Sequence, residues 1–157
     1  MTGARPYTGY DPTISFYQEG TGNIATQGLL YRYVQLWSDT ATWGGDSPPE
    51  DGDSVDIAHG RHLLVDIESS PILNFIVVQG SLIFPSDDLN HDTHHTFDAS
   101  YIMVNEGYLE IGTEDQPYMS KLTITMHGTE TDPYLPVYGN KVIAVRYGQL
   151  EMHGAPR

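Results

Sequence analysis

The strongest constraint on the fold is a unit of ten residues that occurs three times, in residues 75–84, 102–111 and 143–152. Each unit carries a glycine at its sixth position, and these glycines are Gly80, Gly107 and Gly148. Apolar residues alternate on both sides of each glycine, which is the period of a β-strand with one buried face. The unit is therefore predicted to be a strand, a glycine corner and a second strand. Recurrence at a short period is typical of repeat architectures.

Further segments extend this plan in both directions. Residues 54–58 and 62–67 form an earlier strand pair around Gly60, and residues 121–126 supply another first strand. Residues 134–138 are the weaker candidate for its second strand. Successive pairs begin 20 to 26 residues apart, near Ser54, Asn74, Ser100, Lys121 and Lys141. We therefore predict an all-β fold, a right-handed parallel β-helix (solenoid) of about five strand-pair coils.

The chain divides by composition near residue 36. Residues 1–35 are rich in glycine and proline, and we predict that they are a lead-in or the end of a preceding domain. A strand is expected over residues 28–37. It would either cap the first coil, because the end of a solenoid exposes strand edges that must be covered, or be the closing strand of a preceding domain. Residues 36–157 are predicted to form one β-helix domain.

The charge balance excludes several classes of partner. The chain has 21 acidic and 7 basic residues, with a formal net charge of -14 at pH 7. No basic patch for a nucleic-acid backbone is visible in the sequence, and attraction to anionic lipid is not expected. No apolar run is long enough to span a membrane, so no membrane insertion by this segment is predicted. The absence of cysteine excludes disulfides and thiolate metal sites.

Two tryptophans, Trp37 and Trp43, lie six residues apart in a polar, glycine-containing loop. One interpretation is an aromatic platform for a sugar ring. The other is a hydrophobic plug that closes the first coil, which we favour because burial is the commoner use of a tryptophan side chain. Both residues are kept as candidate ligand-binding positions.

His62 and Asp66 are predicted to share the outward face of one strand, since Leu63 and Val65 between them are expected to point inward. They are too far apart for the short hydrogen bond that acid–base catalysis prefers. We therefore place them on a candidate ligand-binding surface and predict no catalytic residue in this segment.

The insertion at residues 85–97 contains the only cluster of histidines in the sequence. Imidazole and carboxylate groups there could bind Zn²⁺, Cu²⁺ or Ni²⁺. The candidate ligands are His91, Asp92, His94 and His95. The alternative, which we favour, is a solvated polar loop, because a loop cluster without a rigid second shell binds metal weakly.

A second set of acidic residues lies in a turn before the first strand pair. Calcium could bind several of its carboxylates, but an acidic turn is the preferred interpretation, since turns commonly use Asp and Gly. The residues are Asp46, Glu50, Asp51, Asp53 and Asp56. No cofactor is therefore predicted, and a divalent cation, Ca or Zn, is the alternative left open.

Several short motifs together resemble the G8 domain, a module of fibrocystin-like and hyaluronan-processing cell-surface proteins. They are Leu36-Trp-Ser-Asp, Trp43-Gly-Gly, Gly52-Asp-Ser-Val-Asp-Ile, Gly60-Arg-His-Leu-Leu-Val-Asp66, Gly80-x-Leu, Gly107-x-Leu, Met126-His-Gly128 and Leu150-Glu-Met-His-Gly154. The family is described as five repeated strand pairs with eight glycines, and the match covers residues 36–157.

The resemblance implies an extracellular or cell-surface setting within a much longer chain, and it carries over no catalytic position. We expect a non-catalytic structural and recognition module that binds carbohydrate or neighbouring protein domains. Its expected partners are adjacent domains of the same long chain, a polysaccharide such as hyaluronan, or further copies of itself. The alternatives are a support subdomain of a hyaluronan-processing glycosidase, or a self-stacking filament or surface-coat subunit.

Overall fold

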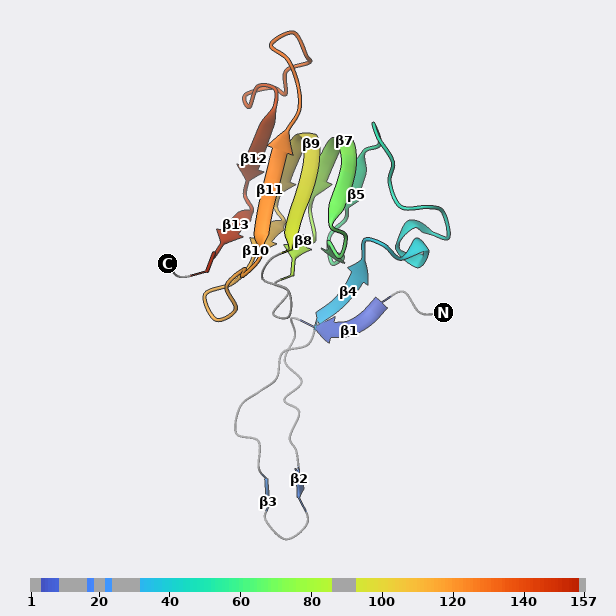
Figure 1. The fold of residues 1–157 in the computed structure, drawn as a ribbon, viewed down its shortest axis with the longest axis vertical. Helices are drawn as coiled ribbons and strands as arrows, with labels where there is room; N and C mark the ends of the chain where they lie inside the picture. Colours follow the sequence, from blue (N-terminus) through green and yellow to red (C-terminus); the bar gives the residue numbers. More distant parts are fainter. Residues whose placement is uncertain (1–3, 9–16, 19–21, 24–31, 86–92, 156–157) are drawn as a thin grey trace.

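The structure, a computed structural model, describes residues 4–8, 17–18, 22–23, 32–85 and 93–155 (Figure 1). Three sheets and one 3-10 helix, η1 (Thr40–Trp43), are seen in these ranges. The first sheet contains β1 (Ala4–Thr8), β4 (Arg32–Leu36), β6 (His62–Leu64), β8 (Ser81–Phe84), β10 (Tyr108–Ile111) and β13 (Gln149–Met152). The second contains β5 (Val55–Ile57), β7 (Ser69–Val78), β9 (His94–Asn105), β11 (Lys121–Met126) and β12 (Val142–Arg146). The third is the pair β2 (Tyr17–Gln18) and β3 (Gly22–Asn23).

The two larger sheets are mostly parallel. The six-stranded sheet has the order β1-β4-β6-β8-β10-β13, and the five-stranded sheet has the order β11-β9-β7-β5, with β12 also paired to β9. From β5 to β10 the chain passes back and forth between the two sheets, so equivalent strands lie side by side in register. One row of paired residues in the six-stranded sheet is Leu63, Leu82, Leu109 and Leu150. The matching row in the five-stranded sheet is Val78, Val104 and Val145.

Glycine is required at the corners between the sheets because successive backbones approach closely there. A Cβ atom built on Gly80 would lie 2.0 Å from the Arg61 carbonyl oxygen, and one on Gly107 would lie 2.2 Å from the Val78 carbonyl oxygen. Hydrogen bonds continue through these corners, since the Tyr108 N–H donates to the Gly80 oxygen at 2.9 Å. The repeated glycines therefore let one strand pair stack on the next.

The hydrophobic core lies between the two larger sheets and holds the apolar residues of the repeat. Leu73, Ile76, Val78, Leu82, Ile102 and Val104 are all 0% exposed. An aromatic group extends this core toward the tryptophan loop. Trp37 packs edge-on against Phe97 with 5.6 Å between ring centroids, and Phe97 packs against Phe84 at 5.1 Å.

The predicted right-handed parallel β-helix is wrong, although the all-β class is correct. The two larger sheets of the described residues are open, and neither closes on itself. The twelve-residue strand β9 pairs with β11 along His94–Ala99 and with β12 along Tyr101–Asn105, so these two strands share one partner and do not stack. At the other end, β1 runs antiparallel to β4.

The predicted second strand at residues 134–138 is also absent. This region contains only an isolated antiparallel bridge between Leu135 and Gly139. Pro133 and Pro136 flank Tyr134 and Leu135, and proline removes the N–H that a strand ladder needs. The alternating pattern thus located most strands and their buried faces, but it did not determine how the strands connect.

Candidate ligand groove beside Trp43

A groove lies where the five-stranded sheet stops at β5 while the six-stranded sheet continues to β4. Its volume is about 440 Å³, and β4, η1, β5 and β6 all contribute residues to it. The residues that line it are Gln35, Thr42, Trp43, Gly44, Ser54, Val55, Asp56, Ile57, Arg61 and Leu63. The groove therefore occupies the place that one more strand of the shorter sheet would fill.

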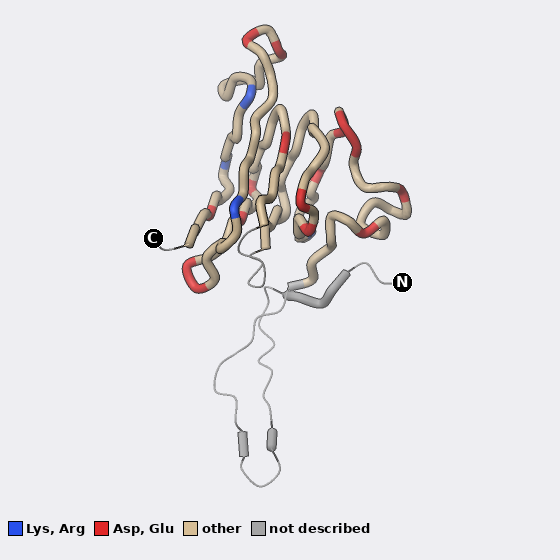
Figure 2. The backbone as a smooth tube through the Cα atoms, in the orientation of Figure 1, with Lys and Arg blue, Asp and Glu red and all other residues tan. Residues whose placement is uncertain are grey.

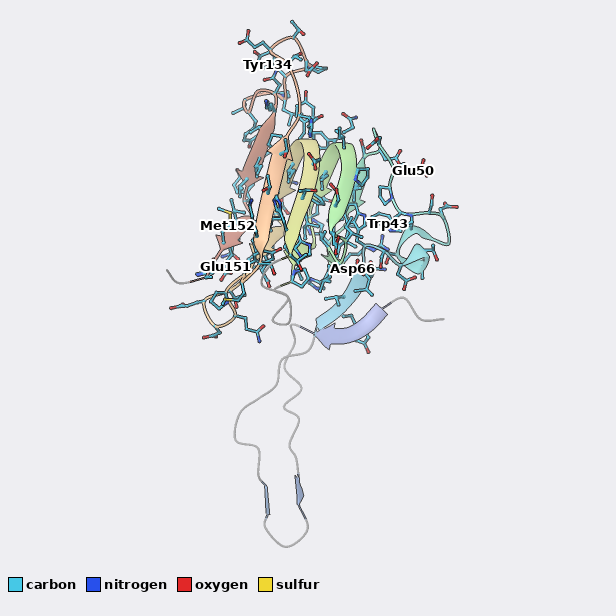
Figure 3. The ribbon with its side chains drawn as sticks, in the orientation of Figure 1. Trp43, Glu50, Asp66, Tyr134, Glu151 and Met152 are labelled. Carbon is cyan, nitrogen blue, oxygen red and sulfur yellow. The ribbon has the colours of Figure 1, made fainter. Side chains whose placement is uncertain are left out.

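The Trp43 ring forms one wall of this groove and is held in a fixed position. Asp39 caps η1 by accepting a hydrogen bond from the Ala41 N–H at 2.9 Å, and Gly44 ends the helix in the left-handed conformation. The Trp43 indole N–H donates to the Trp37 carbonyl oxygen at 2.8 Å, and the two rings pack edge-on at 5.3 Å. Figure 3 shows Trp43 beside β5, on the side of the molecule away from Met152.

The polar groups of the groove come from β4 and η1 and from residues on or just before β5 and β6. Arg61 Nε donates to Gln35 Oε1 at 3.0 Å, and Arg61 Nη2 donates to the Thr42 oxygen at 3.4 Å. Asp56 is exposed on β5, next to Ser54. An aromatic wall combined with amide, guanidinium, carboxylate and hydroxyl groups suits a ligand with an apolar face and several hydroxyls.

The structure places the two predicted tryptophans in different environments. Trp37 is 1% exposed, so it cannot stack on a ligand and instead closes the core, as in the plug interpretation. Trp43 is half-buried and lines the groove. Trp37 is therefore a core residue, and the role of Trp43 as a platform for a sugar ring stays a prediction.

His62 and Asp66 are not brought together, and neither is among the residues that line the groove. A hydrogen bond of 2.9 Å joins His62 Nδ1 to Ser81 Oγ on the adjacent strand β8. Asp66 lies beyond the end of β6, where it accepts hydrogen bonds from the Ser38 N–H at 2.9 Å and the Ser38 hydroxyl at 2.6 Å. Asp66 thereby ties the tryptophan loop to the end of β6.

Of the predicted metal ligands, His91 and Asp92 lie outside the described residues. His94 and His95 are successive residues of β9 and so point to opposite faces of the sheet. His94 Nε2 lies 2.8 Å from Thr123 Oγ1, and His95 Nδ1 lies 3.3 Å from the Ile67 oxygen. Within the described ranges, no group of three or more His, Cys, Asp or Glu residues has the geometry of a metal site. The metal site at this loop stays a prediction.

In the acidic turn, two carboxylates stabilise the backbone. Asp53 Oδ2 accepts a hydrogen bond from the Glu50 N–H at 2.8 Å. Asp51 Oδ1 accepts one from the Ile72 N–H at 2.7 Å. These are the contacts expected of an acidic turn that joins a neighbouring strand.

Sequence reasoning missed Gln35 and Arg61, whose side chains meet in the groove across 26 positions of the chain. No local motif marks this pair, because the parallel pairing of β4 with β6 brings it together. It also missed the contact between His127 Nε2 and Asp98 Oδ1, at 2.7 Å, which links the end of β11 to β9. His127 and His153 end similar Met-His-Gly motifs, but they follow β11 and β13 and therefore lie at different sheets.

Comparison with known proteins gives a consistent result. Residues 42–157 match the G8 domain family. Human Fibrocystin-L is 40% identical over 158 residues, which cover 99% of this chain and 4% of that protein. Dog Fibrocystin is 34% identical over 139 residues, which cover 87% of this chain and 3% of that protein. This chain thus spans only a few hundredths of the length of these relatives.

In the described ranges, no helix is long and apolar enough to cross a membrane.

Proposed function

Because the chain belongs to the G8 domain family, we propose that it is a non-catalytic recognition module of a much longer extracellular or cell-surface protein. The groove beside Trp43 binds a neutral carbohydrate, and the paired sheets hold that groove rigid. The observation that carries this proposal is the fixed indole ring of Trp43 in a groove that polar residues on and beside β4, β5 and β6 also line. Sugar rings present an apolar face to an aromatic ring and hydroxyls to such polar groups.

The charges of the groove favour a neutral sugar over hyaluronan, which is a polyanion. Among the described residues of the lining, Arg61 alone carries a positive charge, and its guanidinium group already donates to Gln35 and Thr42. Asp56 adds an exposed carboxylate, and the whole chain carries a net charge of -14. Long-range repulsion therefore opposes an acidic polysaccharide at this site.

The carboxylates of the groove favour binding over glycoside cleavage. Glycosidases generally place two carboxyl groups on either side of the scissile bond, roughly 5 to 9 Å apart. Asp56 is the one carboxylate among the described residues of the lining. The described part of the groove therefore has groups that suit a sugar ring and lacks the carboxylate pair that would cleave it.

The experiment is a titration of the 157-residue chain with neutral oligosaccharides (cello-, manno- and chito-oligosaccharides) and with hyaluronan oligosaccharides. Tryptophan fluorescence and calorimetry report binding. We expect at least one neutral series to bind, and we expect Asp56→Ala and Trp43→Ala to weaken that binding by about tenfold or more. Asp56→Ala is the safer variant for folding, because Asp56 is exposed.

Tyr134→Ala is the matched control, since Tyr134 is a 68% exposed aromatic residue that lies outside this groove. Its affinity should equal that of the unmodified chain. Absence of binding to every neutral series at millimolar concentration would overturn the carbohydrate assignment. Tighter binding of the hyaluronan oligosaccharides would overturn the charge argument.

The cell-surface setting has its own test, which uses an antibody against the exposed loop at residues 129–140 on cells that express the full-length protein. Labelling of intact cells is expected. Labelling only after permeabilisation would contradict the proposed setting.

A further inference from the structure

The strands at the C-terminal end form a layer of the core that none of the described residues covers. In the six-stranded sheet, Leu82 and Leu109 are 0% and 1% exposed, but their partner in the next strand, Leu150, is 40% exposed. In the five-stranded sheet, Val78 and Val104 are 0% exposed, whereas Val145 is 40% exposed. Equivalent apolar positions are thus buried in the inner strands and become exposed in the last strand of both sheets.

This uncovered layer is also hollow. A pocket of about 500 Å³ opens between the two sheets at this end. Its apolar lining includes Ile111, Leu122, Ile124, Ile143 and Met152. Met152 is 62% exposed, and Tyr147 at the nearby corner is 82% exposed. An apolar surface of this kind, continuous with the core, marks an interaction site.

The edge of β13 is open to further strand pairing. Gln149 and His153 donate their N–H groups to the oxygens of Gly107 and Ile111, both at 2.9 Å. In a parallel ladder, alternate residues bond to opposite sides, so the amides of Leu150 and Met152 face away from β10. The strand contains no lysine or proline, which natural edge strands use to block pairing.

The outer strands at this end, β11, β12 and β13, carry more cations than acids: Lys121, Lys141 and Arg146 lie on or beside β11 and β12, and Glu151 lies on β13. Lys121, Lys141 and Arg146 are exposed on or beside β11 and β12, and they form no ion pair with any other described residue. Figure 2 shows basic residues along the outer strands, while many of the acidic residues lie on loops. A complementary partner therefore carries acidic groups next to its apolar ones.

A second copy of this chain does not fit these conditions. At its other end, the six-stranded sheet continues through β4 and the antiparallel β1, so that end offers no equivalent open layer to receive β13. Two C-terminal ends placed face to face would bring Lys121, Lys141 and Arg146 of both copies together. Like charges opposed across an interface are unfavourable.

We propose that this end docks an acidic strand–glycine–strand segment from elsewhere in the same longer polypeptide, which adds one strand to β13 and one beside β11 and β12. The relatives are far longer than the matched region, so such a segment would be tethered and present at high effective concentration. Parallel addition in register would cover Leu150, Met152 and Val145. In the same way, β13 and β12 cover the layer formed by β10 and β9. This surface is independent of the Trp43 groove.

The test uses a segment whose chemistry is already known from this chain. Residues 102–111 have the required pattern, with two glutamates, Glu106 and Glu110, and no lysine or arginine. The full chain is extended after Arg157 by a Gly/Ser linker of about 15 residues, with a typical span of roughly 20 Å, and then by a second copy of residues 102–111. Amide hydrogen exchange, resolved by NMR, is compared with that of the unextended chain.

We expect exchange at Leu150 and Met152 to slow by about tenfold or more, because their outward amides gain acceptors. Two matched extensions serve as controls. In one, Val104→Ser and Leu109→Ser are made only in the appended copy, and protection should disappear. In the other, Glu106→Lys and Glu110→Lys are made only in that copy, and protection should fall.

Unchanged exchange with the acidic extension, or equal protection from the serine control, would overturn the proposal. Sedimentation of the unextended chain tests whether a second copy of the chain occupies this surface. A monomer is expected. A dimer that dissociates on Leu150→Asp would assign this surface to a second copy and would also overturn the proposal. Sugar binding at the Trp43 groove is measured separately, so failure of either proposal can be recognised without the other.

Discussion

The two ends of the stacked sheets are built from the same repeat but differ in how their last layer is covered. At the tryptophan end, β4 pairs with β6, Trp37 is buried against Phe97, and the loop is tied down by Asp66. At the C-terminal end, the equivalent ladder positions Val145 and Leu150 are each 40% exposed. The comparison teaches that the repeat makes layers, while separate residues outside it decide whether a layer is closed.

The largest expected effect is on the closed end. Trp37→Ala should lower the free energy of unfolding by about 4 kcal/mol, because it leaves a cavity beside Phe97 in a core that is otherwise closed. The measurement is urea unfolding followed by circular dichroism. Tyr147→Ala is the matched aromatic change at the open end, where the side chain is 82% exposed, and it should change stability by less than about 0.5 kcal/mol. Similar losses from both variants would break the comparison.

The corner glycines give the next effect. In Gly107→Ala the new methyl group would meet the Val78 carbonyl oxygen inside the stack, and we expect a loss of about 3 kcal/mol. In Gly148→Ala it would meet the Gly107 oxygen, but the outer strand can shift toward solvent, so about 1.5 kcal/mol is expected. Gly154→Ala, with no atom within 4 Å of its new methyl group, is the control. Thermal unfolding of the three variants tests whether the outer strand shifts to accommodate the new methyl group. If it does, Gly148→Ala loses less stability than Gly107→Ala.

The leucine row allows the same chemical change at two depths. Leu109→Ala should lose about 2.5 kcal/mol, since Leu109 is 1% exposed. Leu150→Ala should lose only about 1 kcal/mol, because its side chain is already 40% exposed. Urea midpoints with an unchanged slope would confirm that folded stability has changed. Equal losses would mean that the C-terminal layer is covered in solution.

The smallest expected effect is at the attachment of the tryptophan loop. Asp66→Ala removes the acceptor of two hydrogen bonds from Ser38 and should lose about 1 kcal/mol. Glu68→Ala, an exposed acidic residue close by in the chain, should be neutral within about 0.5 kcal/mol. If both variants were neutral, the closed end would depend on Trp37 alone.

Much of the strand content could be predicted from the sequence, because alternating apolar residues on both sides of a glycine favour two strands joined at a corner. The strand predicted at residues 121–126 matches β11 fully, and the glycine units match the facing ends of β7 and β8 and of β9 and β10. The connection of these strands could not be predicted in the same way. Nothing in the local pattern showed that the long strand β9 would pair with both β11 and β12.

The groove was only half visible in the sequence. Trp43 stood out because two tryptophans in a polar loop are unusual, but Trp37 beside it proved to be a core residue. Gln35, Arg61 and Asp56 carry no motif: Arg61 contacts Gln35 because β4 pairs with β6, and Asp56 lies on β5 in the other sheet. A site made from the ends of separate strands depends on sheet order, which the sequence pattern did not supply.

The most direct test of the difference between the two ends is amide hydrogen exchange at two equivalent positions in the unmodified chain. The N–H of Tyr108 donates to Gly80, and the N–H of Gln149 donates to Gly107, both at 2.9 Å. The hydrogen bonds have the same length and each amide follows a glycine, so a difference in exchange, corrected for the intrinsic rate of each amide, reports how easily each layer opens. We predict that Gln149 exchanges at least about tenfold faster than Tyr108. Equal protection at the two positions would contradict the account, because it would mean that the C-terminal layer is as closed as the layers beneath it.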